Sequence, residues 1–158
     1  LDADVCEVVN VNKKLGYRGK ILYALALLKC LRTRVPIKVR VICDGSILYD
    51  GDILSIAFGI GKYSGGGMRQ TSDALLDDGL VDITVIPDLP LSIIARKAFR
   101  LFTGSFTKVK ELCVGRGAKV EVIPENVLPN VEVDGENVGQ APVRFEIMPS
   151  QINILGVK

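Results

Sequence analysis

The fold is decided by residues 37–49, which read IKVRVICDGSILY. From Ile37 to Cys43 apolar residues occupy every second position, which is the pattern of a strand with one buried face. The pair Asp44-Gly45 accepts the positive φ angles of a type I′ turn, so residues 46–49 are predicted to return as the second strand of a hairpin. The stretch therefore predicts an antiparallel β structure.

The same signals continue on both sides of this hairpin. Asp50-Gly51 is predicted to form a second turn, and a further hairpin is predicted from Val131 to Val138 around Asp134-Gly135. Additional strands are predicted at residues 5–11, 53–60, 81–86, 119–123, 143–148 and 152–157.

Two helices are predicted among the strands. Between Tyr17 and Leu31 apolar residues recur every three or four positions, as on the buried side of a helix. Residues 91–102 repeat this spacing, with apolar residues on one side and basic residues on the other, and Gly104 ends the helix. We therefore expect residues 1–158 to form a mainly β domain, an antiparallel β-sandwich or barrel-like domain with two inserted helices.

Composition limits the function classes. The chain has 158 residues, which suits one core, and its net charge of +2 is too small to favour a nucleic-acid partner. It contains no histidine, which excludes histidine-dependent nucleophile triads, and its four cysteines form no CxxC pair, which favours reduced thiols over a zinc site. Its apolar runs are too short to span a membrane and no secretory leader is visible, so we expect a soluble, cytoplasmic protein.

Residues 62–82, KYSGGGMRQTSDALLDDGLVD, are the first candidate for a functional segment. The glycine run 65–67 could cradle a phosphate, but a P-loop needs Lys-Ser/Thr directly after its last glycine, and Met68 and Arg69 stand there. The alternative is that the glycines form a bulge or a close backbone crossing.

Four aspartates at positions 73, 77, 78 and 82 follow these glycines. Carboxylates and backbone carbonyls on a tight turn suit a hard cation such as Mg²⁺ or Ca²⁺. The alternative is a turn at Asp77, Asp78 and Gly79 whose carboxylates are solvated.

The hairpin VEVDGENV, residues 131–138, places Glu136 among valines. A two-residue turn would pair Val133 with Glu136 and Val131 with Val138, so the Glu136 carboxylate is predicted to be partly desolvated or paired, as functional carboxylates often are. The alternative is a solvated glutamate at the rim of the strand.

A basic face on the second predicted helix could contact an anionic membrane surface. The alternative is a solvated face on a helix that packs on the core. The basic residues concerned are Arg96, Lys97, Arg100, Lys108, Lys110, Arg116 and Lys119.

Three motifs in order, GKYSGGGM, DALLDDGLVD and VDGE, resemble the C-terminal domain of the diacylglycerol kinase catalytic-domain family. The resemblance implies a two-domain enzyme that transfers the γ-phosphoryl group of ATP to a lipid hydroxyl and visits the membrane transiently. A Gly-Gly-Asp-Gly-Thr nucleotide motif belongs to the N-terminal domain of that family and is absent here. The chain is therefore expected to be half of the enzyme, inactive alone, with the N-terminal nucleotide-binding domain as its partner.

The resemblance also implies roles for individual residues. Glu136 resembles the catalytic carboxylate in the interdomain cleft, and Asp78 resembles the side-chain ligand of a structural Mg²⁺, completed by main-chain carbonyls near Leu75 and Leu80. Other residues are implied to lie near the nucleotide or the cleft: Gly65, Gly66, Gly67, Asp134 and Gly135.

Two other functions remain open from the sequence. One is a non-catalytic β-sandwich module that binds a lipid or another small ligand, with acidic turns that are only structural. The other is the activity of the NAD kinases, which are relatives of the lipid kinases with the same fold.

Overall fold

The computed structural model describes residues 31, 33–64, 67–149 and 151. The strands predicted at residues 5–11 and 152–157 lie outside this part of the chain, as does the helix predicted from Tyr17, apart from Leu31. Leu31 is helical. The described residues include no helix long and apolar enough to cross a membrane.

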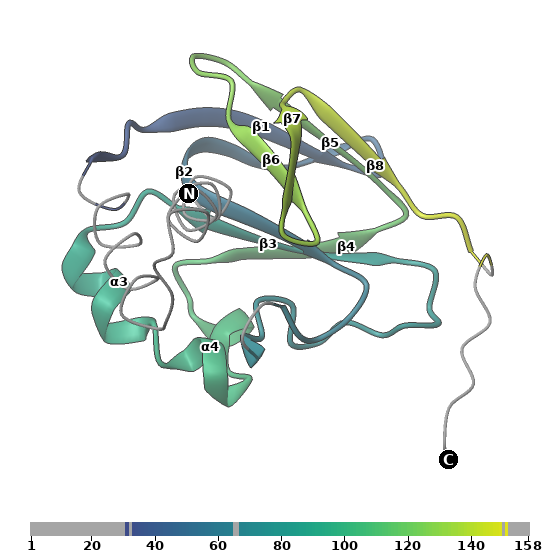
Figure 1. The fold of residues 1–158 in the computed structure, drawn as a ribbon, viewed down its shortest axis with the longest axis horizontal. Helices are drawn as coiled ribbons and strands as arrows, with labels where there is room; N and C mark the ends of the chain where they lie inside the picture. The colour runs from purple at the N-terminus through teal and green to yellow at the C-terminus, as the bar shows by residue number, and fades with distance from the viewer. Residues whose placement is uncertain (1–30, 32, 65–66, 150, 152–158) are drawn as a thin grey trace, which may run out of the picture.

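One six-stranded antiparallel sheet organises the domain, in the order β4-β3-β2-β1-β5-β8 (Figure 1). A separate two-stranded sheet pairs β6 with β7. The strands are β1 (Ile37–Cys43), β2 (Ser46–Gly59), β3 (Val81–Pro87), β4 (Cys113–Gly117), β5 (Lys119–Pro124), β6 (Asn130–Val133), β7 (Glu136–Gln140) and β8 (Val143–Glu146). The predicted antiparallel, mainly β class is confirmed, although the large sheet is not a closed barrel because β4 and β8 are its two ends.

The hairpin predicted from residues 37–49 is confirmed. Cys43 pairs with Ser46 across the turn, and the φ angles of Asp44 and Gly45 are 47° and 81°, as a type I′ turn requires. Both Asp44 carboxylate oxygens accept backbone N–H groups, from Lys119 at 2.9 Å and Ala118 at 3.3 Å. The turn therefore also anchors the start of β5.

The turn predicted at Asp50-Gly51 is wrong, because β2 runs unbroken through it. Asp50 lies opposite Arg40 on β1, and its carboxylate Oδ2 accepts a hydrogen bond from Arg40 Nε at 2.8 Å. A Cβ on Gly51 would lie 3.1 Å from the hydroxyl of Tyr49, so the glycine makes room for that ring within the strand. An Asp-Gly pair is thus kept in a strand by its cross-strand partner and its neighbour.

The helix predicted over residues 91–102 is two short helices, α3 (Leu91–Lys97) and α4 (Arg100–Thr103), and a 3-10 turn, η2 (Phe106–Lys108), follows. Gly104 caps α4 in the left-handed conformation, as predicted. The apolar side of this segment was expected to be buried, but neither α3 nor α4 contains a buried residue. Strand β4 was not predicted, because CVGRG is short and contains two glycines that weaken the strand pattern.

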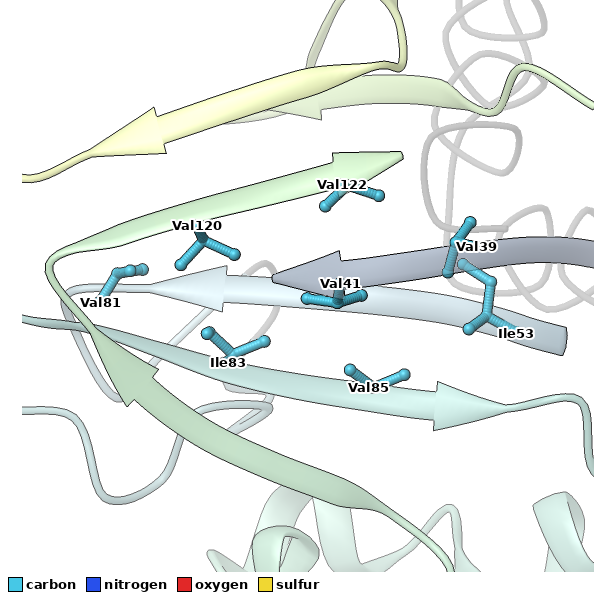
Figure 2. Close-up of a cluster of buried hydrophobic side chains, with 8 residues drawn as sticks. All are labelled: Val39, Val41, Ile53, Val81, Ile83, Val85, Val120 and Val122. Atoms are coloured by element: carbon cyan, nitrogen blue, oxygen red, sulfur yellow. The ribbon is translucent and has the colours of Figure 1, made fainter. Parts of the chain in front are cut away.

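One face of the large sheet carries the core (Figure 2). Eight side chains from β1, β2, β3 and β5 meet there, each at most 6% exposed: Val39, Val41, Ile53, Val81, Ile83, Val85, Val120 and Val122. Strands β1 and β5 lie between β2 and β8 in the sheet, yet the ring centroids of Phe58 on β2 and Phe145 on β8 are 4.5 Å apart. This short distance shows that the sheet is strongly curved.

The opposite face of β3 is also covered, since all residues from Val81 to Val85 are buried. Thr84 donates a hydrogen bond to the carbonyl of Gln70 at 2.7 Å, so the segment between β2 and β3 lies on this face. Phe106 and Val109 are buried too, and α3 and α4 lie beyond β4 in the view of Figure 1. This second layer places residues 73–82, which we call the acidic segment, against β3 and β4.

Candidate functional site

The acidic segment is organised by one cation, Arg116 on β4. Strand pairing puts Arg116 directly opposite Asp82 on β3, and Arg116 Nη2 lies 3.1 Å from each oxygen of the Asp82 carboxylate. The same nitrogen donates to the carbonyl of Asp73 at 3.1 Å, and Nη1 lies 3.6 Å from Asp78 Oδ2. The hydrogen bond to Asp82 and the nearby carboxylates raise the pKa of Arg116.

The Asp78 carboxylate has two oxygens in different environments. Its Oδ1 accepts the N–H of Leu80 at 3.0 Å, which fixes the turn before β3. Its Oδ2 is buried and has no hydrogen-bond partner, and the guanidinium of Arg116 at 3.6 Å offers only a longer ionic contact. A buried carboxylate oxygen without a donor is costly, so this atom is available for a cation.

Hydroxyl groups extend the site toward the 3-10 turn. Thr107 Oγ1 donates to Asp73 Oδ2 at 2.8 Å and lies 2.8 Å from the hydroxyl of Ser72. A cavity of about 290 Å³ opens between these groups and the strands, and Asp73, Asp82, Thr84, Thr107 and Arg116 are among the residues that line it. The cavity therefore combines oxygen atoms and one guanidinium with the apolar side chains of Ile83 and Val114.

Mg²⁺ is implied by the family resemblance, and one atom of this site fits it, the unpartnered Oδ2 of Asp78, which also lies 3.6 Å from Nη1 of Arg116. Mg²⁺ prefers oxygen ligands and often keeps several waters, so one buried carboxylate oxygen is a sufficient protein anchor when backbone carbonyls complete the site. The described residues contain no group of three or more Asp, Glu, Cys or His side chains that could hold a metal, so any site at Asp78 would depend on backbone carbonyls and water for most of its ligands. Asp77 is exposed and lies outside this arrangement.

Replacement of Arg116 by glutamine is expected to lower the melting temperature by a few degrees, because Asp82 and Asp78 would lose their shared cation. Differential scanning fluorimetry of the full-length protein measures the change. Arg144→Gln on β8 is the matched control, because Arg144 and its ion-pair partner Glu146 both have exposed side chains. An equal melting temperature for Arg116→Gln and the wild type would contradict this role.

The last glycine of the run, Gly67, lies in a tight loop. Gly65 and Gly66 lie outside the described residues, and Gly67 has a φ angle of 85° and donates its N–H to the carbonyl of Ser64 at 3.0 Å. Nothing lies within 4 Å of the position of a Cβ on Gly67, so this glycine serves the loop conformation and not a close backbone crossing.

The hairpin of β6 and β7 carries Glu136 at the first position of β7. Its turn is confirmed, with φ angles of 51° at Asp134 and 91° at Gly135, and Val133 pairs with Glu136 as predicted. The pairing of Val131 with Val138 is wrong, because a bulge places Gly139 opposite Val131. Glu136 therefore keeps its predicted pairing, and the register changes only further along the hairpin, beyond Glu132.

The Glu136 carboxylate was expected to be partly desolvated or paired, and this is wrong within the described residues. Glu136 is exposed, and no described residue forms a hydrogen bond or an ion pair with it. The carboxylate that serves the turn is that of Glu132, which accepts the N–H of Gly135 at 2.7 Å. Glu136 is therefore free for an external partner.

The structure brings some of the predicted residues together and leaves others apart. Asp73, Asp78 and Asp82 meet around Arg116, whereas Asp134, Gly135 and Glu136 lie on the small sheet. Among the described residues no hydrogen bond or ion pair joins these two groups. Arg116 was assigned to a membrane-facing basic set by sequence; its position opposite Asp82 depends on strand β4, which the sequence did not predict.

The family model described as the YegS C-terminal NAD kinase beta sandwich-like domain matches residues 1–156. The chain belongs to this family. Among curated proteins, this YegS-type C-terminal domain is 28% identical over 137 residues to a protein of Stenotrophomonas maltophilia named "Probable lipid kinase YegS-like". It is also 26% identical over 144 residues to a protein of Mycobacterium tuberculosis named "Diacylglycerol kinase".

These matches cover 86% and 91% of the YegS-type domain but only 44% and 46% of the relatives, so the chain spans less than half their length. A crystal structure of a diacylglycerol kinase from Bacillus anthracis superposes with a TM-score of 0.60 at 23% identity, over 83% of this chain and 44% of that one. This likeness shows that the two chains share a fold.

Proposed function

We propose that the chain is the C-terminal domain of a lipid kinase that transfers the γ-phosphoryl group of ATP to the hydroxyl of a lipid such as a diacylglycerol or a sphingoid base. The observation that carries the proposal is the family match over residues 1–156, together with relatives named as lipid and diacylglycerol kinases. The ATP would be held mainly by an N-terminal domain, and the assembled enzyme would be cytoplasmic and peripheral to the membrane.

Glu136 is the residue we propose as the base. In the reaction the lipid oxygen forms a bond to the γ-phosphorus of ATP, the bond between that phosphorus and the β,γ-bridging oxygen breaks, and ADP leaves. The hydroxyl proton must be accepted, and an exposed carboxylate without an internal partner is suited to accept it. The neighbouring turn at Asp134-Gly135 would hold Glu136 toward the cleft, and the glycines Gly65, Gly66 and Gly67 would lie near the same cleft.

Asp78 is the residue we propose as the Mg²⁺ ligand, with the main-chain carbonyls of Leu75 and Leu80. The unpartnered Oδ2 of Asp78 supports this assignment. Bound there, Mg²⁺ would neutralise the carboxylate and tie the turn to the start of β3. Arg116 would compete for the same oxygen, because its Nη1 lies 3.6 Å away.

The test of the proposed function is a transfer assay with the full-length protein, [γ-³²P]ATP, Mg²⁺ and a dispersed short-chain diacylglycerol. Labelled phosphatidic acid is the expected product. Sphingosine and NAD are offered in parallel reactions, since each would report a different relative of this fold. Lipid binding without phosphate transfer to any of them would contradict the proposal and favour a binding module.

Replacement of Asp78 by asparagine is expected to remove most of the thermal stabilisation that Mg²⁺ confers. A ligand at 100 times its dissociation constant adds about 2.7 kcal/mol to the free energy of unfolding, and the neutral amide would lose the charge that attracts the ion. The melting temperature is measured with and without Mg²⁺ in the full-length protein. Asp77→Asn is the control, because Asp77 is the exposed neighbour in the same turn. An unchanged Mg²⁺ response in Asp78→Asn would reject the site.

A further inference from the structure

The helices α3 and α4 expose large apolar side chains that the core does not use. Phe99, in the link between the helices, and Phe102, on α4, are each 61% exposed, and Leu91 at the start of α3 is 41% exposed. Exposing two phenylalanine rings so close in sequence forgoes the stabilisation that their burial would give. These rings are therefore candidates for an external contact.

The loop that precedes the acidic segment carries a third exposed aromatic ring, and this loop is attached to α4. The backbone N–H of Arg69 donates to the carbonyl of Leu101 on α4 at 2.7 Å, so the loop is fastened to the helix. The Arg69 guanidinium donates to the hydroxyl of Tyr63 at 2.6 Å and stacks on its ring, with Cζ 4.7 Å from the centroid. Tyr63 is 63% exposed. We call Tyr63, Phe99 and Phe102 the aromatic ridge.

The segment that contains α3 and α4 and continues to the start of β5 is strongly basic. Residues 91–119 contain seven Lys or Arg and one Asp or Glu, a net charge of +6, whereas the whole chain has +2 and the remainder therefore −4. Two of these cations, Arg116 and Lys119, already pair with acids outside the segment. Lys97 pairs with Glu111, the single acid of this segment, at 2.8 Å. Arg96, Arg100 and Lys108 form no salt bridge with any described residue, so their charges are available to an anionic partner.

We propose that the aromatic ridge and its basic neighbours dock the protein on the surface of an anionic lipid bilayer. Phe99 and Phe102 would enter the region between head groups and acyl chains, and Arg96 and Arg100 would contact lipid phosphates. Apolar rings beside basic side chains are the composition of interfacial membrane anchors. The proposal rests on the proposed function, which already makes the enzyme peripheral to the membrane, and it adds the surface that would dock there.

A second copy of the chain fits this surface less well. A two-fold contact would bring the same surface of both copies together, and thus the same uncompensated arginines. A bilayer that contains phosphatidylglycerol offers many phosphates at once, and it accepts apolar rings without a matching pocket. Charge complementarity therefore favours the membrane.

The experiment is flotation of the full-length protein with vesicles of phosphatidylglycerol and phosphatidylcholine, compared with vesicles of phosphatidylcholine alone. The wild type is expected to bind the anionic vesicles, and raised salt should weaken the binding. Phe99→Ser with Phe102→Ser should lower the partition coefficient about tenfold or more. Arg96→Gln with Arg100→Gln should lower it by a similar factor on anionic vesicles and should reduce its dependence on salt.

Two matched controls lie elsewhere on the sheet. Ile47→Ser removes an apolar side chain that is 64% exposed on β2, and Arg144→Gln removes an exposed arginine on β8. Neither should change vesicle binding by more than about twofold, since scattered surface residues add little. A loss as large as that of the ridge variants would show that the effect is not specific to this surface.

Hydrogen exchange supplies a measurement that does not depend on mutations. Backbone amides of residues 91–104 should exchange more slowly when anionic vesicles are added, while those of 37–49 should not change. The proposal is overturned if the wild type does not bind anionic vesicles, if the ridge variants bind as well as the wild type, or if residues 91–104 show no protection.

The results that would reject the proposed kinase activity differ from those that would reject the docking surface. Phosphorylation of a dispersed short-chain diacylglycerol by the wild type requires no bilayer. Its absence would reject the lipid kinase activity while vesicle binding still stands, whereas its presence with no vesicle binding would reject only the docking surface.

Discussion

Replacement of Glu136 by glutamine is expected to lower kcat of lipid phosphorylation by the full-length protein about 100-fold or more. A positioned general base contributes about 10²–10⁴-fold to a rate, and the neutral amide cannot accept the hydroxyl proton. The KM for ATP should change little, because the proposed role of Glu136 concerns the lipid hydroxyl. The assay is initial-rate transfer from [γ-³²P]ATP to a short-chain diacylglycerol.

The loss in this variant should not arise from unfolding. The side chain of Glu136 is exposed and forms no hydrogen bond with a described residue, so the melting temperature should match that of the wild type. Glu146→Gln is the control, since it makes the same change at an exposed glutamate on β8. If Glu136→Gln keeps the wild-type rate, or if Glu146→Gln loses as much, the assignment of the base is wrong.

The parts of the fold that could be predicted from sequence are those fixed by local chemistry. Period-two alternation and an Asp-Gly pair identified the hairpin of β1 and β2, because both the strand pattern and the positive φ angles are local properties. The same pair at Asp50-Gly51 misled, since an ion pair to Arg40 and the ring of Tyr49 keep it in a strand. Arg40 lies ten residues away in the sequence, and the position of the Tyr49 ring depends on the folded conformation. The Asp-Gly pair alone therefore cannot predict that this segment is a strand.

In the candidate site, too, local sequence predicted some features and strand register determined the others. The acidic segment was predicted because its aspartates are close in sequence, but Arg116 lies 34 residues from Asp82 and reaches it only through the register of β3 with β4. The exposure of Glu136 was missed because alternation within the hairpin predicts a buried face, whereas every residue of β7 is exposed and Val133, its predicted partner, is exposed as well. Sequence identified the residue types, and strand register determined their partners.

The two halves of the proposed mechanism depend differently on the rest of the protein. Asp78 and Arg116 belong to a second layer that covers β3, so their geometry is set within this domain. Glu136 is exposed on a small sheet, so its partner must come from outside the described residues. We therefore expect Mg²⁺ stabilisation to survive changes that abolish transfer, such as Glu136→Gln.

Replacement of Ile83 by alanine is expected to destabilise the large sheet by about 2–5 kcal/mol, the range for truncating a buried isoleucine to alanine. Ile83 is 1% exposed and lies on β3, between β2 and β4, within the core of Figure 2. Its removal would leave a cavity among valines that are themselves buried, and β-branched side chains have few rotamers with which to fill it.

Native-state hydrogen exchange of the full-length protein measures this change strand by strand. Amides of β1, β2 and β3 should lose protection together, because their side chains share one core. Ile123→Ala is the matched control, since Ile123 on β5 is 41% exposed and its truncation should cost well under half as much. Equal losses from the two variants, or a loss for Ile83→Ala below about 1 kcal/mol, would mean that this face of the sheet is not the core that stabilises the domain.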